Sequence, residues 1–448
     1  MKYFGTDGIR GTYGDTEISE PFFEALGRAA ADWLAENGGG KIVVGGDTRA
    51  STDALKAAFV SGLEKGGAAC EDLGVLPTPA LAYGVLAHGA AAGAMITASH
   101  NPYTDNGIKF FDSKARKVED EAQERLETLL EKYYSPDSSY APKTFAPRKI
   151  SAGSFARDEY AKKMASIFPA GFLKGVKIVI DMANGATSGI SSKVFADYGA
   201  QVFELGCEPT GLNINDGIGS QHPEKMAAYC KEVGADVGFA HDGDGDRVVV
   251  CDDKFSILEG EEVMGLIATE EYERGRLAAD AIVTTLQSNT GLDESLAAKG
   301  IKVFRCGIGD RLVMREMLDR GCNVGGENSG HFIFSEISPC GDGLAAALAV
   351  LSVMARKRKK LSELRGGIAM YPCVSKAVAV ARKTPIEETA NLSKALKKCD
   401  ELLAGRGRTL VRYSGTEKKI RLLAESPDAE KARQCMEILL AAVEIDLK

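Results

Sequence analysis

The sequence lacks the patterns that mark secreted, membrane-spanning and zinc-binding proteins. Its ten cysteines are scattered and none form a C-x-x-C pair, so neither a disulfide scaffold nor a zinc ribbon is predicted. The longest apolar run, 344–355, is shorter than the roughly 20 residues that cross a bilayer. Residues 1–15 contain no apolar segment of the kind found in signal peptides. We therefore expect a protein of the reducing cytoplasm that does not bind membranes.

The common nucleotide-binding motifs are also missing. The dipeptide Gly40–Lys41 is followed by Ile42, where a Walker A motif needs Ser or Thr. The pair Gly307-x-Gly309 lacks the third glycine of a dinucleotide-binding loop. An ATPase or a dinucleotide enzyme is therefore disfavoured. The formal net charge of -8 argues against general nucleic-acid binding, although it allows a local basic cleft for a phosphorylated metabolite.

The chain does contain short aliphatic runs that alternate with amphipathic stretches. Residues 20–37 and 119–134 have apolar side chains at three- and four-residue spacing, which predicts helices. Strands that end in polar or glycine-rich loops are predicted at 41–49, 176–186, 235–247 and 281–291. This alternation indicates parallel sheets in α/β units, where functional loops follow the carboxyl ends of the strands.

The length of 448 residues predicts three or four domains. The stretch 135–147 is rich in Pro and Ser and breaks the alternating pattern, so a boundary is placed near it. From about residue 367 the pattern changes to an alternating strand, a helix and a polar loop, which indicates a small α+β domain. We expect α/β domains at 1–149, 150–253 and 254–366 and an α+β domain at 367–448.

The clearest local signal is the loop 241–247, which directly follows an apolar strand. Its carboxylates at Asp242, Asp244 and Asp246 would repel one another unless a hard divalent cation such as Mg²⁺ bound them. An EF-hand does not fit, because Arg247 takes the place of the required glycine. The alternative is a solvated acidic turn without a metal.

Three further loops carry polar groups that suit a phosphorylated sugar. The loop 412–417 offers a guanidinium and hydroxyls for a phosphate, and the loop 325–331 offers a carboxylate and a hydroxyl for sugar hydroxyls. Each could instead be an ordinary polar turn. The third, TASHNP at 97–102, contains Ser99 beside His100. Neighbouring side chains in an extended segment point in opposite directions, so a serine–base pair is not predicted.

As a set, these loops resemble those of the α-D-phosphohexomutase superfamily over essentially the whole chain. Within it, the sequence is most similar to the bacterial phosphoglucosamine mutases. The stretches that carry this resemblance are YFGTDGIRG, TASHNPYTDNGIKFF, MANGATS, GLNINDGIGSQHPE, LQSNTGL and GGENSGHFIF. The resemblance implies three related α/β domains with mixed or parallel sheets and a C-terminal α+β domain, arranged around a central cleft.

The resemblance also implies a role for each loop. Ser99 would carry a phosphoryl group, and this phosphoserine would hold Mg²⁺ together with Asp242, Asp244 and Asp246. The sugar hydroxyls would contact Glu327 and Ser329. The phosphate that does not react would be bound by Arg412, Ser414, Gly415 and Thr416. The reacting end would be lined by Arg10, His100 and Lys109. Of these, we favour Lys109 over His100 as the general base, since neighbouring cations would lower the pKa of a desolvated lysine.

The implied reaction converts glucosamine 6-phosphate into glucosamine 1-phosphate through a 1,6-bisphosphate, which supplies amino-sugar nucleotides and cell-wall precursors. Mg²⁺ would be the cofactor, and glucose or glucosamine 1,6-bisphosphate the activator. Ser99 could first be phosphorylated by a kinase or by that bisphosphate, and a homodimer is an open alternative to a monomer. Alternative functions are a phosphomannomutase/phosphoglucomutase, a metal-dependent phosphatase and a sugar-phosphate sensor. The sensor is disfavoured because Ser99 and all three aspartates are present.

Overall fold

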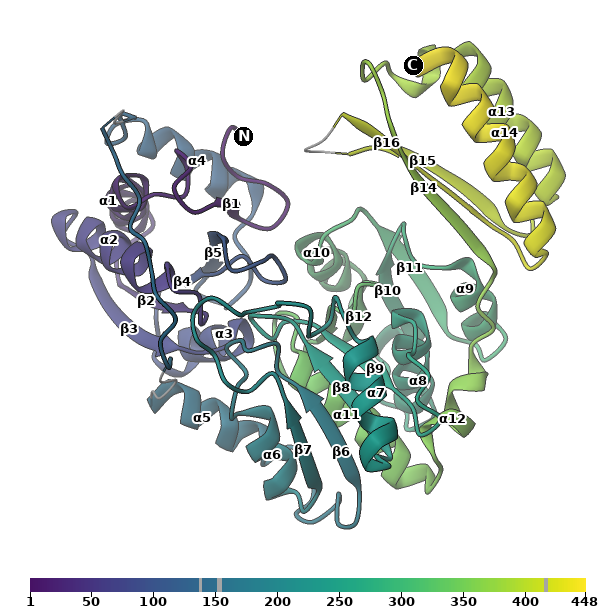
Figure 1. The fold of residues 1–448 in the computed structure, drawn as a ribbon, viewed down its shortest axis with the longest axis horizontal. Helices are drawn as coiled ribbons and strands as arrows, with labels where there is room; N and C mark the ends of the chain where they lie inside the picture. Colours follow the sequence, from purple (N-terminus) through teal and green to yellow (C-terminus); the bar gives the residue numbers. More distant parts are fainter. Residues whose placement is uncertain (137–138, 151–154, 415–417) are drawn as a thin grey trace.

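Three consecutive parts of the chain fold into sheets with the same strand order (Figure 1). In each sheet a first strand lies between a second and a third strand that run parallel to it. A fourth strand then pairs antiparallel with the third. The computed structural model describes residues 1–136, 139–150, 155–414 and 418–448. The expected α/β architecture is therefore present three times, although the sequence has no strict repeat.

The first domain adds one strand to this plan, because β1 pairs antiparallel with β5. Its central strand β2 is buried along Ile42, Val43 and Val44, as expected for a parallel strand covered on both faces. In chain order its elements are β1 (Ile9–Thr12), α1 (Glu20–Glu36), β2 (Lys41–Gly46), α2 (Thr52–Lys65), β3 (Ala69–Val75), α3 (Thr78–Ala87), β4 (Ala92–Ile96), β5 (Asp105–Asp112) and α4 (Asp120–Leu130).

The second domain has the strand order β7-β6-β8-β9. All five residues of β8, which leads into the acidic loop, are buried. Its elements are α5 (Phe155–Met164), β6 (Lys177–Asp181), α6 (Ser191–Asp197), β7 (Gln201–Leu205), α7 (Glu224–Val233), β8 (Val237–His241) and β9 (Val248–Cys251).

The third domain has the order β11-β10-β12-β13 and contains the apolar run 344–355. That run lies in α11, where Asp342 caps the first turn by accepting from the Ala345 N–H at 2.9 Å. No helix in the described parts of the chain is long and apolar enough to cross a membrane. The elements are α8 (Gly260–Glu273), a 3₁₀ turn (Ala278–Asp280), β10 (Ala281–Thr285), α9 (Thr290–Ala297), β11 (Lys302–Cys306), α10 (Asp310–Arg320), β12 (Val324–Gly326), β13 (Phe332–Phe334), α11 (Gly343–Lys357), α12 (Leu361–Leu364) and a 3₁₀ turn (Arg365–Gly367).

The C-terminal domain has a different architecture, with two helices against a three-stranded antiparallel sheet of order β14-β16-β15. Figure 1 shows it at the upper right, apart from the first domain. Its elements are β14 (Cys373–Ala379), a 3₁₀ turn (Ile386–Glu388), α13 (Ala390–Leu403), β15 (Arg408–Tyr413), β16 (Lys419–Glu425) and α14 (Ala429–Leu447).

The apolar core is distributed unevenly over the four domains. One continuous cluster of buried side chains runs through the first three, for example from Met95 through Phe239 to Phe332. The C-terminal domain has a separate cluster around Leu392 and Leu439. The first three domains therefore share a core, whereas the fourth keeps its own.

Polar contacts join the C-terminal domain to the third. Glu425 Oε1 accepts from the Thr290 N–H at 2.9 Å and from Arg408 Nε at 2.7 Å. The same Arg408 donates to the Ser288 carbonyl at 2.6 Å. Glu425 and Arg408 belong to the sheet of the C-terminal domain, and their partners lie at the start of α9, so these four residues form a polar joint.

Candidate active site

Three of the predicted site loops occupy the same position in the three related domains. Each connects the third strand to the antiparallel fourth strand, at 97–104, 242–247 and 327–331. The third strand ends at the carboxyl edge of its sheet, which is where ligands bind in α/β proteins. The loops also lie next to one another. The Ser99 hydroxyl of the first donates to Asp242 Oδ2 of the second at 2.6 Å. The N–H of Val248, which directly follows the second loop, donates to the Gly330 carbonyl of the third at 3.0 Å. The repeated topology therefore brings the loops to one place.

Ser99 lies in the first of these loops in a backbone conformation that is rare outside glycine. Its φ is +54° and its side chain is buried. The hydroxyl donates to Asp242 Oδ2 at 2.6 Å, whereas His100 Nδ1 is 3.4 Å away. The nearest partner of Ser99 therefore comes from the second domain and not from the adjacent histidine.

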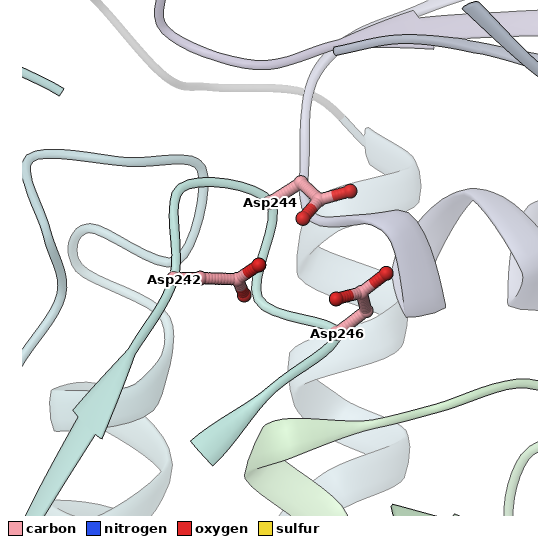
Figure 2. Close-up of side chains that lie close together, drawn as sticks. All are labelled: Asp242, Asp244 and Asp246. Carbon is pink, nitrogen blue, oxygen red and sulfur yellow. The ribbon is translucent and has the colours of Figure 1, made fainter. Parts of the chain in front are cut away.

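The carboxylates of Asp242, Asp244 and Asp246 converge at the end of β8. Figure 2 shows all three pointing toward one another from a single tight turn. One oxygen of each lies within 4.8 Å of the others, and all three side chains are buried. Gly245 has a φ of +71°, which lets the turn close tightly enough for alternate side chains to meet.

This cluster fits a divalent cation. Asp244 Oδ1 and Asp246 Oδ1 are buried and have no hydrogen-bond partner among the described residues. Burial raises the pKa of Asp242 well above its ordinary value, and the charges of Asp246 and Asp244 add to this shift. Buried carboxylate oxygens that face one another without donors are a suitable ligand set for Mg²⁺.

Lys109, on β5, has surroundings opposite to those expected. Its Nζ lies 2.8 Å from Asp244 Oδ2, 2.9 Å from Asp246 Oδ2 and 3.3 Å from Asp7 Oδ2. Burial by itself would lower the pKa of Lys109, but these carboxylates outweigh burial and raise the pKa well above its usual value. The expectation that cations depress this pKa is wrong, because the lysine is the positive partner of the acidic loop.

His100 and Arg10 lie near the same loop. The pKa of His100 is lowered to about 4, first by burial and then by the positive charges of Arg247 and Arg10. Its imidazole is therefore neutral at pH 7. Arg10, on β1, forms an ion pair with Asp7, which places its guanidinium beside the carboxylate that also contacts Lys109.

Six side chains of alternating charge form a closed ring that joins the first three domains. In order they are Lys109, Asp7, Lys117, Asp310, His331 and Asp246. Lys117 links the first domain to the third, because it pairs with Asp7 and lies 2.6 Å from Asp310 Oδ2 at the start of α10. We call this set the charge ring.

The charge ring continues through the third domain to the acidic loop. His331 Nε2 lies 3.1 Å from Asp310 Oδ2, and His331 Nδ1 lies 3.6 Å from Asp246 Oδ1. Burial disfavours the charged imidazole, but the two carboxylates outweigh burial and raise the pKa of His331 to about 10. Sequence reasoning missed Asp7, Lys117 and Asp310, although Asp7 lies within the stretch FGTDGIRG.

The predicted sugar loop begins at the end of β12. Glu327 is buried, and its Oε1 accepts from the Gly309 N–H at 3.0 Å. Its pKa is raised, chiefly by burial. Ser329 is exposed. The loop thus offers one fixed carboxylate and one accessible hydroxyl.

The predicted phosphate loop follows β15 in the C-terminal domain. Arg412 faces Arg421 across the strand pair, and the pKa of Arg412 is lowered by burial and by the charge of Arg421. Both line a cavity of about 240 Å³ together with Gln287 of the third domain. Ser414 is buried, while Gly415 and Thr416 lie outside the described residues. Arg421 was not predicted, because the sequence between the two arginines does not reveal their pairing.

Comparison with known proteins identifies the family. Models of the phosphoglucomutase/phosphomannomutase family match consecutive parts of the chain: the alpha/beta/alpha domains I, II and III at 1–137, 158–256 and 259–371, and the C-terminal domain at 376–442. The phosphoglucosamine mutase of Geobacillus thermodenitrificans is 40% identical over 445 residues, covering 97% of each chain. The chain belongs to the phosphoglucosamine mutase family. The resemblance stated from the sequence is confirmed, and the family consists of phosphohexomutases, which are isomerases.

Further comparisons agree with this assignment. The phosphoglucosamine mutase of Haemophilus influenzae (strain PittEE) is 41% identical over 444 residues, covering 99% of this chain and 98% of the relative. A phosphoglucomutase/phosphomannomutase family protein of Burkholderia thailandensis has a similar fold, with a TM-score of 0.80, 24% identity and coverage of 98% and 96%. An N-acetylphosphoglucosamine mutase of Aspergillus fumigatus, solved with GlcNAc-6P and magnesium, has a TM-score of 0.63 and 17% sequence identity. The match covers 98% of this chain and 95% of that chain. The expected fold class is confirmed.

Proposed function

We propose that the protein interconverts glucosamine 6-phosphate and glucosamine 1-phosphate, with Ser99 as the phosphoryl carrier. The observation that carries the proposal is the contact of the buried Ser99 hydroxyl with Asp242, at 2.6 Å, in a cluster of three carboxylates. A serine hydroxyl beside a site for a divalent cation is suited to carry a phosphoryl group, because the cation would stabilise the charge on the phosphoryl oxygens. The phosphoglucosamine mutases that are about 40% identical to the chain support the choice of sugar.

Mg²⁺ is the proposed cofactor. Asp242, Asp244 and Asp246 would hold it together with a phosphate oxygen on Ser99. When bound, the ion would neutralise charge on the phosphoryl oxygens. The Aspergillus fumigatus N-acetylphosphoglucosamine mutase was solved in complex with magnesium, which supports this choice.

In the proposed reaction the 1-hydroxyl of glucosamine 6-phosphate attacks the phosphorus atom on Ser99. The bond between Ser99 Oγ and phosphorus breaks as the bond to the sugar oxygen forms, which gives the 1,6-bisphosphate. The bisphosphate then turns round, and Ser99 takes the 6-phosphoryl group to leave glucosamine 1-phosphate. Phosphoryl transfer of this kind depends mainly on positioning and on charge. Glucose or glucosamine 1,6-bisphosphate would prime an enzyme that has lost its phosphate.

The 1-hydroxyl gives up a proton, and Ser99 Oγ gains one when it leaves. We assign the proton relay to His100, whose Nδ1 is 3.4 Å from Ser99 Oγ. Lys109 is reassigned from general base to a fixed positive charge, because its ammonium group contacts Asp244 and Asp246. Arg10 would add a second positive charge at the reacting end.

The remaining residues would bind the substrate at its far end. Glu327 and Ser329 would contact sugar hydroxyls. The phosphate that does not react would be bound by Arg412, Ser414, Gly415 and Thr416, and we add Arg421 because it faces Arg412 across the strands. A dianion between two adjacent guanidinium groups would relieve their mutual repulsion.

Three measurements test the function. Mass spectrometry of the purified protein is expected to find one phosphate on Ser99, either as isolated or after incubation with a hexose 1,6-bisphosphate. Turnover of glucosamine 6-phosphate is expected to exceed that of mannose 6-phosphate and glucose 6-phosphate when all three are compared. Faster turnover of either of the latter would assign the protein as a phosphomannomutase/phosphoglucomutase. Release of free phosphate at the rate of sugar conversion would indicate a phosphatase.

A further inference from the structure

One buried arginine binds the backbone of the loop that contains Ser99. Arg49 is 2% exposed, and its guanidinium donates to three carbonyl oxygens of that loop and to one at the start of β5. These belong to Ser99 at 3.0 Å, Asn101 at 2.8 Å, Asp105 at 2.9 Å and Pro102. Planar guanidinium can reach several acceptors at once in fixed directions, whereas an ammonium group is a single point of charge.

The arginine is itself held in place. Asp47 Oδ2 accepts from Arg49 Nε at 2.8 Å and from Thr97 Oγ1 at 2.7 Å. Thr97 Oγ1 in turn accepts from the Ser99 N–H at 2.9 Å. Both backbone polar groups of Ser99 are therefore fixed by one connected network, which also neutralises the buried guanidinium.

A second domain contributes to the same restraint. Asn215 Nδ2 donates to the carbonyls of Ser99 and Asn101, both at 2.9 Å. Gly243 packs so closely against this point that a Cβ there would lie 2.7 Å from the Ser99 carbonyl oxygen. The carrier loop is thus held between the first domain and the acidic loop of the second.

We propose that Arg49 is a positioning residue that holds Ser99 in its left-handed conformation, with Oγ facing Asp242, and that Asn215 assists it. The inference rests on the proposed role of Ser99 as carrier. A serine with a φ of +54° needs surrounding contacts that determine its conformation. Because the backbone is held on both sides, the phosphoryl group is always presented at one point beside the acidic loop. The sugar must then move between half-reactions, since Ser99 does not.

The test compares Arg49→Lys, which keeps the charge but loses the planar fork, with Asn215→Ala. Displacing a reacting group by about 1 Å can cost about 10²-fold in rate. We therefore expect kcat to fall about 10²-fold in Arg49→Lys and about tenfold in Asn215→Ala. The KM for glucosamine 6-phosphate is expected to change less than about threefold. Amide hydrogen exchange in 97–106 is expected to become faster in Arg49→Lys.

Arg305 supplies a matched control in the third domain. Like Arg49 it pairs with a carboxylate, Asp293, and donates to three backbone carbonyls, those of Thr285, Ser288 and Asn289. Arg305→Lys is expected to lower thermal stability while keeping kcat, measured per folded molecule, close to that of the wild type.

Each outcome bears on the inference. A wild-type kcat in Arg49→Lys, with only a lower Tm, would mean that the arginine serves stability alone and would overturn it. If Arg49→Lys does not fold, the kcat of Asn215→Ala tests the inference instead. A wild-type kcat in Asn215→Ala would also overturn the inference. If the wild type never carries phosphate on Ser99, the proposed function fails first, independently of Arg49.

Discussion

At the scale of single residues, the charge of the acidic loop is compensated unevenly. Lys109 contacts Asp244 and Asp246, whereas Asp242 receives the Ser99 hydroxyl and, at 3.2 Å, the Arg247 N–H. Among the described residues, Asp242 therefore bonds to two neutral donors, whereas Asp244 and Asp246 each contact the ammonium group of Lys109. A cation between the three carboxylates would correct this imbalance.

Because of this imbalance, we expect the effect of Mg²⁺ on the Tm to depend on whether residue 242 carries a carboxylate. We expect Mg²⁺ to raise the Tm of the wild type by a few degrees and EDTA to reverse the rise, because a ligand that binds only the folded state stabilises it. In Asp242→Asn the Mg²⁺ response should vanish, while the Tm in EDTA should equal or exceed that of the wild type, since one repulsive charge is gone. Differential scanning fluorimetry measures both. An equal Mg²⁺ response in the two proteins would contradict the site.

Variants of Lys109 can distinguish a role as a fixed positive charge from a role in proton transfer. We expect Lys109→Met to lower kcat about 10²- to 10³-fold, because a fixed positive charge beside the transferring group is lost. Lys109→Arg should recover at least about tenfold of that loss if the role is charge alone. Steady-state kinetics at pH 7 decides. An arginine variant as inactive as the methionine variant would return the role of general base to Lys109.

At the scale of elements, the sequence predicted well what depends on local pattern. The expected strands at 41–49 and 235–247 correspond to β2 and β8, and the expected helix at 20–37 to α1. Burial on both faces produces continuous aliphatic runs, and glycine-rich polar loops mark their ends. The loops were visible because their charges are concentrated within a few residues. The domain limits at 149, 253 and 366 remain predictions.

Other features could not be read from the sequence because they depend on distant partners. Asp310 and Lys117 are 193 positions apart by their numbering, and each alone resembles a surface charge. The neighbours of Lys109 were misjudged for the same reason, since Asp244 lies in another domain. The pairing of Arg412 with Arg421 required the register of β15 and β16.

His241, the last residue of β8, makes stability depend on pH. It is buried, donates from Nδ1 to the Arg247 carbonyl at 3.0 Å and accepts from the Ser191 hydroxyl at 3.0 Å. Burial lowers its pKa to about 4, whereas the unfolded chain protonates near 6.5. We therefore expect the contribution of His241 to stability to be fully present above pH 6.5 and to be lost as the pH drops toward 4, by about 3 kcal/mol at most.

The corresponding variant is His241→Asn. In EDTA, urea midpoints between pH 7 and pH 4 should fall less steeply for the variant than for the wild type. The exposed His222, which lies outside the core, is the control position, and His222→Asn should leave the slope unchanged. Identical slopes for His241→Asn and the wild type would show that this imidazole does not set the dependence.

At the scale of the whole molecule, the charge ring links the three related domains. Each member of the ring contacts two opposite charges within the ring, so removing one leaves two neighbours partly uncompensated. Within the ring, Lys117 is three contacts and Asp310 two contacts away from Asp246, and neither is proposed to contact the reacting atoms. They can therefore be varied to test whether domain position affects the rate.

We expect Lys117→Met and Asp310→Asn each to lower kcat about tenfold or more, and the double variant to be about as active as either single one. Non-additivity of this kind is expected when two residues act through one shared contact. The kcat values of the wild type, the two single variants and the double variant measure this non-additivity. The exposed pair Arg433 and Glu430, which lies on α14, is the control and should leave kcat unchanged. Multiplicative losses from Lys117 and Asp310 would show that the two act independently.

The separate core of the C-terminal domain has a consequence for how long an intermediate stays bound. Among the described residues, the buried apolar cluster of the C-terminal domain is separate from those of the other domains. The domain meets the third domain through polar contacts, which include the polar joint at Glu425 and Arg408 and an ion pair between Arg406 and Glu294 at 3.7 Å. We therefore expect a rotation of this domain to cost mainly the free energy of polar contacts rather than of apolar burial. A bisphosphate that must turn round needs a residence time longer than its own reorientation but shorter than a catalytic cycle. A joint made of hydrogen bonds allows that time to be adjusted by single substitutions without any change to the three domains that carry out the chemistry.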